Sequence, residues 1–222
     1  MGISFFTIAL AIGLGLALFV ARPHILSLLV GQLLESRWGV EDIRFHAVDG
    51  IIKIILFIAY IWLISLSKDI RRVFEYHGAE HKSIYAYEAG EELTVENARK
   101  YSRLHPRCGT AFILIVLVMS IIFFSIVFPF VPRFSFLPKP VTQVIYIIFK
   151  ILLMFPIAGI AYEIIKYSSK KISNPFMKAI IMPGLWMQNL TTREPSDDQL
   201  EIALAALEKA ICLHNKLIKE GI

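Results

Sequence analysis

The chain has 222 residues and a net charge of +5, 56% of its residues are hydrophobic, and its mean hydropathy is +0.63. A soluble core of this size cannot bury so much apolar surface, and the apolar residues come in long blocks. A soluble globular protein is therefore excluded, and a membrane protein is predicted. The sequence has no basic stripe interleaved with aromatic residues, so the positive charge does not indicate nucleic-acid binding.

Four apolar blocks are long enough to cross a bilayer. The first, residues 3–21, carries no charge and has about the length needed for a hydrocarbon core of roughly 30 Å. A cleaved signal peptide is disfavoured, because no basic segment precedes this block and no convincing cleavage site follows it. The other three blocks are residues 51–66, 111–131 and 141–165. Residues 25–34 are interpreted as a helix in the membrane interface or as a re-entrant piece.

The distribution of lysine and arginine predicts the orientation of these spans. Segment 68–107 contains eight basic residues, and so does the tail from residue 166, whereas segments 22–48 and 132–140 contain three and two. The positive-inside rule therefore places both basic segments and both chain termini in the cytoplasm, with the chain in the inner (plasma) membrane and the lipid bilayer as its partner. Both cysteines then face a reducing compartment, where a structural disulfide is not expected.

The predicted fold class is all-α, a polytopic membrane protein with about four transmembrane helices, a cytoplasmic helical hairpin and an amphipathic helical tail. This pattern divides the chain into four segments. Residues 1–67 hold the first two spans and the interfacial helix, residues 68–110 the hairpin, residues 111–166 the last two spans, and residues 167–222 the tail.

The hairpin is predicted from helix start and stop signals. Residues 69–88 contain no proline and are followed by an Ala-Gly pair, which is typical of a helix end. Thr94 can then cap a second helix that runs through Arg103. With a rise of about 1.5 Å per residue, the returning chain comes level with the middle of the first helix near residue 104.

Residues that bind metals gather in this hairpin. His77 and His81 lie four residues apart and so share one face of a helix, with Glu80 between them in the His-x-x-Glu-His order of inverted zincins. A histidine pair on a helix surface is by itself more often simply solvated. Here the returning chain brings His105 and Cys108 to the same level, and mixed imidazole and thiolate donors favour Zn²⁺. The predicted zinc ligands are therefore His77, His81, His105 and Cys108.

The number of ligands decides what such a site does. Four protein ligands would make the zinc structural, whereas three ligands and a water would make it catalytic, and the sequence leaves both open. Glu80 is either a general base or a solvated helix charge. Glu88 lies about 10 Å further along the helix and is expected behind the ligands or on plain surface. Glu163, near the end of the fourth span, is an alternative ligand or a structural partner of Arg71 or Arg72.

The tail is predicted to contain two helices. Asn174 and Pro175 begin a short apolar helix that is expected to break at Pro183. The run from Ser196 to Gln199 is a capping box for a second helix. Its apolar stripe is more typical of packing on the same chain than on a partner. The stripe consists of Leu200, Leu204, Leu207 and Ile211.

Three separated motifs carry a resemblance to a known family. They read Arg72-Val-Phe-Glu-Tyr-His-Gly-Ala-Glu-His-Lys-Ser-Ile, His105-Pro-Arg-Cys-Gly-Thr and Pro183-Gly-Leu-Trp-Met-Gln-Asn-Leu-Thr-Thr-Arg-Glu-Pro195. On these motifs, about residues 45 to 210 resemble the YqhQ family, bacterial membrane proteins of unknown function that are described as predicted metal-dependent enzymes. The resemblance implies a metal-dependent activity but no substrate. Family members usually carry a further glycine-rich amino-terminal segment with a Gly-Val-Met element, whereas this chain opens directly on an apolar block.

The sequence therefore predicts a zinc-dependent membrane protein that hydrolyses a membrane-associated peptide or lipid at the cytoplasmic surface, with Glu80 as the catalytic base. The alternative is a non-enzymatic scaffold or accessory subunit in which zinc is structural and the tail binds a membrane-protein or peptide partner. A transporter is disfavoured, because no span is expected to carry the paired charges of an ion pathway.

Overall fold

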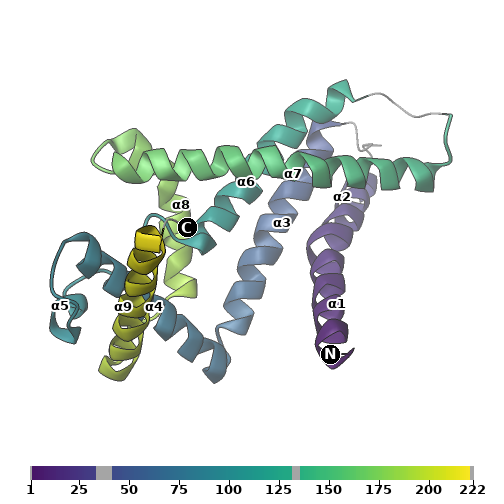
Figure 1. Ribbon diagram of the computed structural model, residues 1–222. Coiled ribbons are helices and arrows are strands. Elements are labelled where there is room, and N and C mark those ends of the chain that lie inside the picture. The colour runs from purple at the N-terminus through teal and green to yellow at the C-terminus, as the bar shows by residue number, and fades with distance from the viewer. Residues whose placement is uncertain (1, 34–41, 132–135, 221–222) are drawn as a thin grey trace. The chain divides into compact units, whose positions relative to one another are not determined.

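The computed structural model describes residues 2–33, 42–131 and 136–220, and within these ranges it contains helices and no strand (Figure 1). The longer helices are α1 (Gly2–Leu16), α2 (Arg22–Leu33), α3 (Ile43–Ile64), α4 (Lys68–Glu88), α6 (Gly109–Val127), α7 (Lys139–Lys170), α8 (Pro175–Thr191) and α9 (Asp197–Glu220); α5 (Val95–Arg99) is short. Four stretches are long and apolar enough to cross a membrane, namely Phe6–Leu33, Ile43–Ile64, Gly109–Phe130 and Val144–Lys170. The predicted all-α class and the number of spans are confirmed.

The first apolar helix is longer than the sequence predicted. A π-helical turn, Ala17–Ala21, joins α1 to α2, so residues 25–33 continue the first helix and do not form a separate interfacial piece; residue 34 lies outside the described residues. Pro23 explains the turn. Proline has no N–H, and its ring crowds the carbonyl four residues earlier, so the preceding turn widens while the helix continues.

The second span begins at Ile43, eight residues before the predicted start, which adds Arg44 and Asp49 to the Lys53 that the predicted span already contained. Asp49 and Lys53 lie one turn apart, with 2.6 Å between the carboxylate oxygen and Nζ, and the Asp49 side chain is 5% exposed. The opposite charges of Asp49 and Lys53 neutralise each other, which lowers the cost of placing them in an apolar membrane span. The expectation that no span carries paired charges is therefore wrong.

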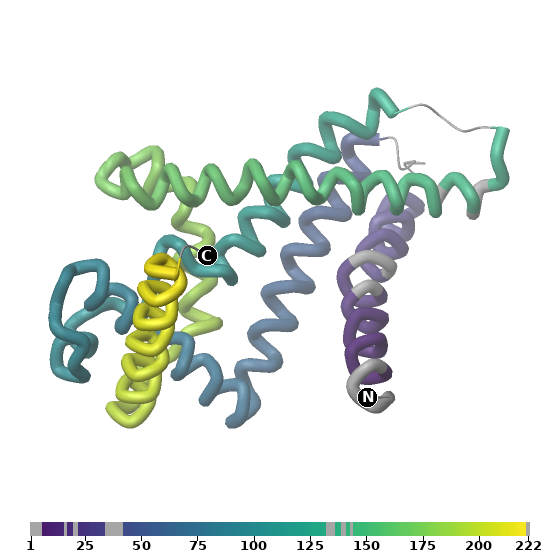
Figure 2. The backbone as a smooth tube through the Cα atoms, in the orientation of Figure 1, coloured from purple at the N-terminus to yellow at the C-terminus, as the bar shows by residue number. Residues whose placement is uncertain are grey.

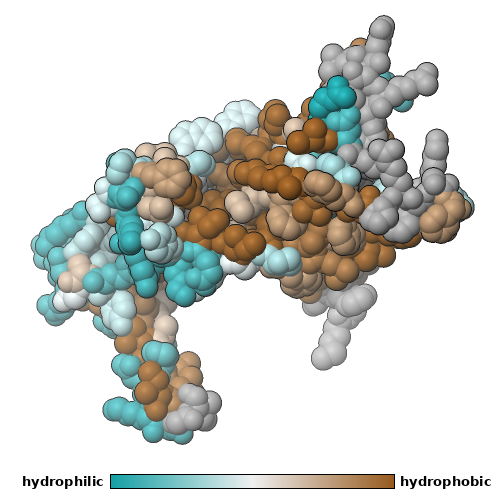
Figure 3. Space-filling model, turned by 90° about the horizontal axis from the view of Figure 1, so that it is seen from above, coloured by the Kyte–Doolittle hydropathy of each residue, from teal (hydrophilic) through white to brown (hydrophobic). Residues whose placement is uncertain are grey.

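The described residues divide into two compact units, and each is considered by itself. The first comprises Met1–Tyr60 and Phe112–Ile172. Its core lies between α3, α6 and α7, while large apolar side chains stay exposed on the outer faces of these helices, as the hydrophobic (brown) surface in Figure 3 illustrates. The buried core residues are Phe45, Ile115, Val116, Phe124, Phe128, Tyr146, Ile157, Ala161 and Ile165.

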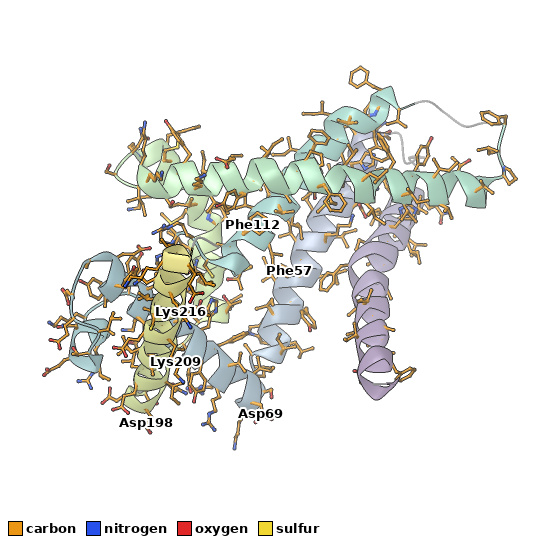
Figure 4. The ribbon with its side chains drawn as sticks, in the orientation of Figure 1. Phe57, Asp69, Phe112, Asp198, Lys209 and Lys216 are labelled. Carbon is orange, nitrogen blue, oxygen red and sulfur yellow. The ribbon has the colours of Figure 1, made fainter. Side chains whose placement is uncertain are left out.

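The second unit comprises Ile61–Ala111 and Ser173–Ile222, and its core lies between α4 and α9. Small residues on α4, Ala79 and Ala86, let Leu200 and Leu204 of α9 pack closely against it. Both helices have acidic residues in the first turn, where the helix dipole favours them; Figure 4 labels Asp69 on α4 and Asp198 on α9.

The chain that follows α8 crosses α4 at Gly78. The Arg193 N–H donates to the Phe74 carbonyl at 2.8 Å, so the chain that leaves α8 lies directly on α4. A Cβ atom at Gly78 would stand 2.1 Å from the Arg193 carbonyl oxygen. Only glycine allows this crossing, which fixes the end of α8 beside the histidines of α4.

The hairpin is confirmed at its start and corrected at its end. α4 ends at Glu88, Gly90 has φ +74°, and the Thr94 hydroxyl accepts from the Asn97 N–H. The second helix, however, stops at Arg99 and does not reach Arg103. The chain then returns in an irregular path (Figure 2).

The irregular path from residue 100 to 108 has a physical reason. Ser102 Oγ accepts from the Leu104 N–H at 3.0 Å, which offers the backbone an alternative to a helix. The carbonyls that a helix would have used accept hydrogen bonds from side chains: Arg103 from His81, Leu104 from Tyr85, and His105 from Gln188. These contacts satisfy the buried backbone.

The tail follows the predicted start signals. Asn174 Oδ1 accepts from the Phe176 N–H at 2.9 Å, and the Ser196 N–H donates to Gln199 Oε1 at 2.9 Å. The predicted break at Pro183 is wrong, because α8 continues to Thr191. Pro183 has no N–H, so α8 loses one backbone hydrogen bond at this position. The helix continues because packing holds its next turn, in which Met187 and Gln188 are fully buried.

Candidate metal centre

Two histidines of α4 and the cysteine that precedes α6 come together in the second unit. The His77 Nε2 and Cys108 Sγ atoms are 3.2 Å apart. One donor atom from each of His77, His81 and Cys108 lies within 4.8 Å of the other two. His77 and His81 are four residues apart on α4, so their rings lie on the same face of the helix. The chain that returns from α5 brings the Cys108 thiol to this face.

The backbone fixes the orientation of both imidazole rings. His77 Nδ1 lies 2.8 Å from the Thr191 carbonyl oxygen, and His81 Nδ1 lies 2.6 Å from that of Arg103. A carbonyl can only accept, so Nδ1 carries a proton in each ring and Nε2 faces the centre. There Nε2 offers a lone pair when the ring is neutral and an N–H when the ring is protonated. Metal-bound histidines are held in this way, with the second ring nitrogen donating to a carbonyl or a carboxylate.

The surroundings of Cys108 favour the thiolate. Burial acts against ionisation, but hydrogen bonds from His77, His81 and Thr110 outweigh it and lower the pKa of Cys108 to about 5. The Thr110 hydroxyl is 3.1 Å from Sγ. Burial likewise acts to lower the pKa of His77, but its bonds to Cys108 and Thr191 raise it overall. A thiolate is the form in which cysteine binds metals.

His105 lies in the same pocket but outside the group of three donors. Its ring centroid is 5.7 Å from that of His81 and 4.6 Å from that of Tyr85. Gln188 holds its backbone on both sides, accepting from the His105 N–H at 2.7 Å and donating to its carbonyl at 2.8 Å.

The hydrogen bonds of the His105 ring define its tautomer. Nδ1 accepts from the Arg107 N–H at 3.2 Å, so the proton of the neutral ring is on Nε2, which faces a Glu88 carboxylate oxygen at 3.5 Å. Burial, partly opposed by Glu88, lowers the pKa of His105. The ring is therefore a buried neutral hydrogen-bond donor beside His77, His81 and Cys108.

The donors line a cavity of about 260 Å³. Its wall is formed by α4 and by residues 105–109 of the second unit. Besides the three donors, the side chains at its wall include Glu80, Glu88, His105 and Arg107. The cavity therefore joins candidate ligands, a candidate base and hydrogen-bond donors in one space.

The three predicted acidic residues have different surroundings. Glu80 is exposed and faces the cavity. Glu88 binds Arg107 and faces His105. Glu163 belongs to the first unit, where its carboxylate pairs with Lys166 at 3.6 Å. Arg71, one of its expected partners, pairs instead with Glu75.

Three residues of the site were missed from the sequence. Thr191 holds the His77 ring, Gln188 holds the backbone of His105, and Thr110 contacts the Cys108 thiol. Gln188 and Thr191 both lie in the third family motif, and Thr110 ends the second. Their presence in these motifs is the signal that could have identified them. Gln188 and Thr191 lie far from the histidines along the chain, so the sequence gave no geometric reason to place them at the site.

Comparisons with known proteins agree with these motifs. The family model described as "Protein of unknown function (DUF1385)" matches residues 1–212. The chain is 36% identical over 167 residues to "Uncharacterized protein YqhQ" of Bacillus subtilis (strain 168), a match that covers 75% of this chain and 49% of the relative. The chain thus spans about half the length of that relative. No solved structure matches.

Proposed function

We infer that the activity of this chain follows from the chemistry of its site, since the chain belongs to the family of proteins of unknown function that DUF1385 describes. We propose that it is a zinc-dependent hydrolase that acts at the membrane surface. The observation that carries this proposal is the group of His77, His81 and Cys108, with both Nδ1 atoms bound to carbonyls.

The donor set suits zinc. Two imidazole nitrogens and one thiolate form a combination that Zn²⁺ accepts in tetrahedral geometry. Zinc bonds of about 2.0–2.3 Å to these donors put neighbouring ligand atoms roughly 3.3–3.8 Å apart. The 3.2 Å between His77 Nε2 and Cys108 Sγ is close to this range. These two atoms would therefore have to move apart only slightly to bind the ion.

Three protein ligands leave one position for water, which favours a catalytic over a structural zinc. His105 is the residue that would close the site, but its Nε2 faces Glu88 and its backbone is held by Gln188. The ring would have to turn away from both neighbours to reach the ion. The scaffold alternative depends on that movement.

The residues of the cavity account for hydrolysis of an amide or ester. Bound zinc would polarise the carbonyl and acidify a water molecule. Glu80 takes a proton from that water as its oxygen adds to the carbonyl carbon, then passes the proton to the leaving nitrogen or oxygen. The bond is thereby replaced by a carboxyl group and a free amine or alcohol.

The position of Cys108 in the chain suggests the class of substrate. It directly precedes the apolar stretch Gly109–Phe130, so the site lies at headgroup level where that helix enters the bilayer. The proposed substrates are membrane-associated peptides or lipids. The basic residues of segment 68–107 favour the cytoplasmic side for this site.

Metal analysis tests the site. Protein purified in detergent without chelator should contain about one zinc per chain, and Cys108→Ser or His77→Ala with His81→Ala should lose it. Cys212→Ser and His214→Ala, in the exposed part of α9, are matched controls that should retain it. His105→Ala should also retain zinc; loss of zinc in this variant would indicate a closed, structural site. Absence of any transition metal from the unmodified protein would refute the proposal.

Glu80→Gln tests the catalytic role. The amide is nearly isosteric but cannot accept the proton, so this variant should keep zinc yet fail to complement a deletion of the gene. Glu96→Gln, on the exposed side of α5, is the control and should complement. Full complementation by Glu80→Gln would favour the non-enzymatic scaffold.

A further inference from the structure

A second cavity lies in the first unit and shares no lining residue with the cavity of the candidate metal centre. Its volume is about 300 Å³. Apolar side chains from the turn Ala17–Ala21, α6 and α7 form most of its wall, among them Phe19, Leu117 and Ile151. Two lysines, Lys53 of α3 and Lys150 of α7, line the same space. Both lie inside stretches that are apolar enough to cross a membrane.

The charges of this cavity do not balance. Asp49 neutralises Lys53 through the 2.6 Å ion pair. Lys150 Nζ lies over the rings of Phe45, Phe124 and Phe128, at 5.9, 5.7 and 5.1 Å from their centroids. Among the described residues it forms no ion pair with a carboxylate. Aromatic faces stabilise a cation but supply no counter-charge, so one positive charge remains in an apolar setting, where it is costly.

We propose that this cavity binds a single-chain anionic amphiphile, a long-chain carboxylate, with its head at Lys150 and Lys53 and its hydrocarbon tail along α6 and α7. The remaining positive charge calls for a monovalent anion, and the apolar wall calls for hydrocarbon. A volume of about 300 Å³ corresponds to roughly ten groups the size of a water molecule, which suits part of one acyl chain and not a two-chain lipid.

Photolabelling tests the proposal. The full chain is placed in phosphatidylcholine nanodiscs and labelled with oleate that carries a diazirine in its chain. Labelled peptides should map to α6 or α7, and unlabelled oleate should compete. Oleyl alcohol, which has the same chain without the charge, should compete at least about tenfold more weakly, because it lacks the charge-assisted contact. Inorganic phosphate should not compete.

Variants separate charge from structure. Lys150→Met should weaken oleate binding about tenfold, whereas Lys150→Arg should bind within about twofold of the unmodified chain. Asp49→Asn removes the negative charge and should strengthen binding, a gain that a misfolded protein cannot produce. Lys171→Met, at the exposed end of α7, is the matched control and should bind normally.

Four outcomes would overturn the proposal. Equal competition by oleate and oleyl alcohol would reduce the cavity to an unspecific apolar crevice. Unchanged oleate binding in Lys150→Met would show that the Lys150 ammonium group does not contact the bound carboxylate. Displacement by inorganic phosphate would indicate a site for a free anion, and displacement by phosphatidylglycerol at a lower mole fraction than oleate would indicate a two-chain lipid.

Discussion

At the scale of single residues, the candidate centre depends on which atoms face one another. His77 and His81 turn their Nε2 atoms toward Cys108 because backbone carbonyls hold the opposite nitrogens. A thiol among donors of this kind is ionised well below its ordinary range. The pKa of the Cys108 thiol therefore shows whether the two imidazole rings are placed as described.

Zinc-free protein should reveal this shift. In a Cys212→Ser background, the thiolate absorbance of Cys108 should titrate with a midpoint near the pKa of about 5 in the folded chain. In denaturant the midpoint should lie near the ordinary thiol value of about 8.5. Because the folded value is the lower one, the contribution to the free energy of unfolding is complete above the unfolded pKa and is lost as pH falls through about 5. An ordinary midpoint in the folded chain would contradict the described contacts.

At the scale of elements, the crossing at Gly78 places α8 and the chain after it on α4. The Arg193 carbonyl lies where a side chain at this position would be. The same crossing brings the Thr191 carbonyl to His77. The glycine of the His-Gly-Ala-Glu-His motif is thus required by packing, while its histidines are required by the site.

Gly78→Ala should consequently destabilise the second unit by about 1–3 kcal/mol, the usual cost of overpacking, and should weaken zinc retention. Thermal unfolding in detergent and zinc content would measure both effects. Gly159→Ala is the matched control, since nothing lies within 4 Å of a Cβ atom there and alanine favours a helix interior. An unfolding temperature of Gly78→Ala equal to that of the unmodified chain would show that the crossing is looser than described.

At the scale of the whole molecule, four apolar stretches are compatible with a multi-pass membrane protein. The basic residues are concentrated in segment 68–107 and in the tail, both of which contribute to the second unit. The orientation prediction and the proposed cytoplasmic hydrolase therefore depend on the same segments.

Reporter fusions test that orientation. A reporter inserted near Gly90 should be active as a cytoplasmic reporter, because eight basic residues around it oppose translocation. A reporter near Ser135 should be active outside. The reverse pattern would place Cys108 in an oxidising compartment and would overturn the argument that its thiol stays free.

The sequence by itself determined the local features of this protein. The number of spans, the start of α4, the turn at Gly90 and the caps at Thr94 and Asn174 follow from composition and short-range signals. The four-residue spacing of His77 and His81 likewise sufficed to place them on one face. These features depend on neighbours within one helical turn, and the sequence shows those neighbours directly.

Only the tertiary structure decided the rest. It brought donor atoms of His77, His81 and Cys108 within 4.8 Å of one another and turned His105 toward Glu88. It also supplied the Thr191 carbonyl from a position 114 residues away from His77. It also brought Lys150 to the cavity that Lys53 lines. Such contacts depend on how helices pack, and packing is set by the shapes of many side chains at once, which no local pattern encodes.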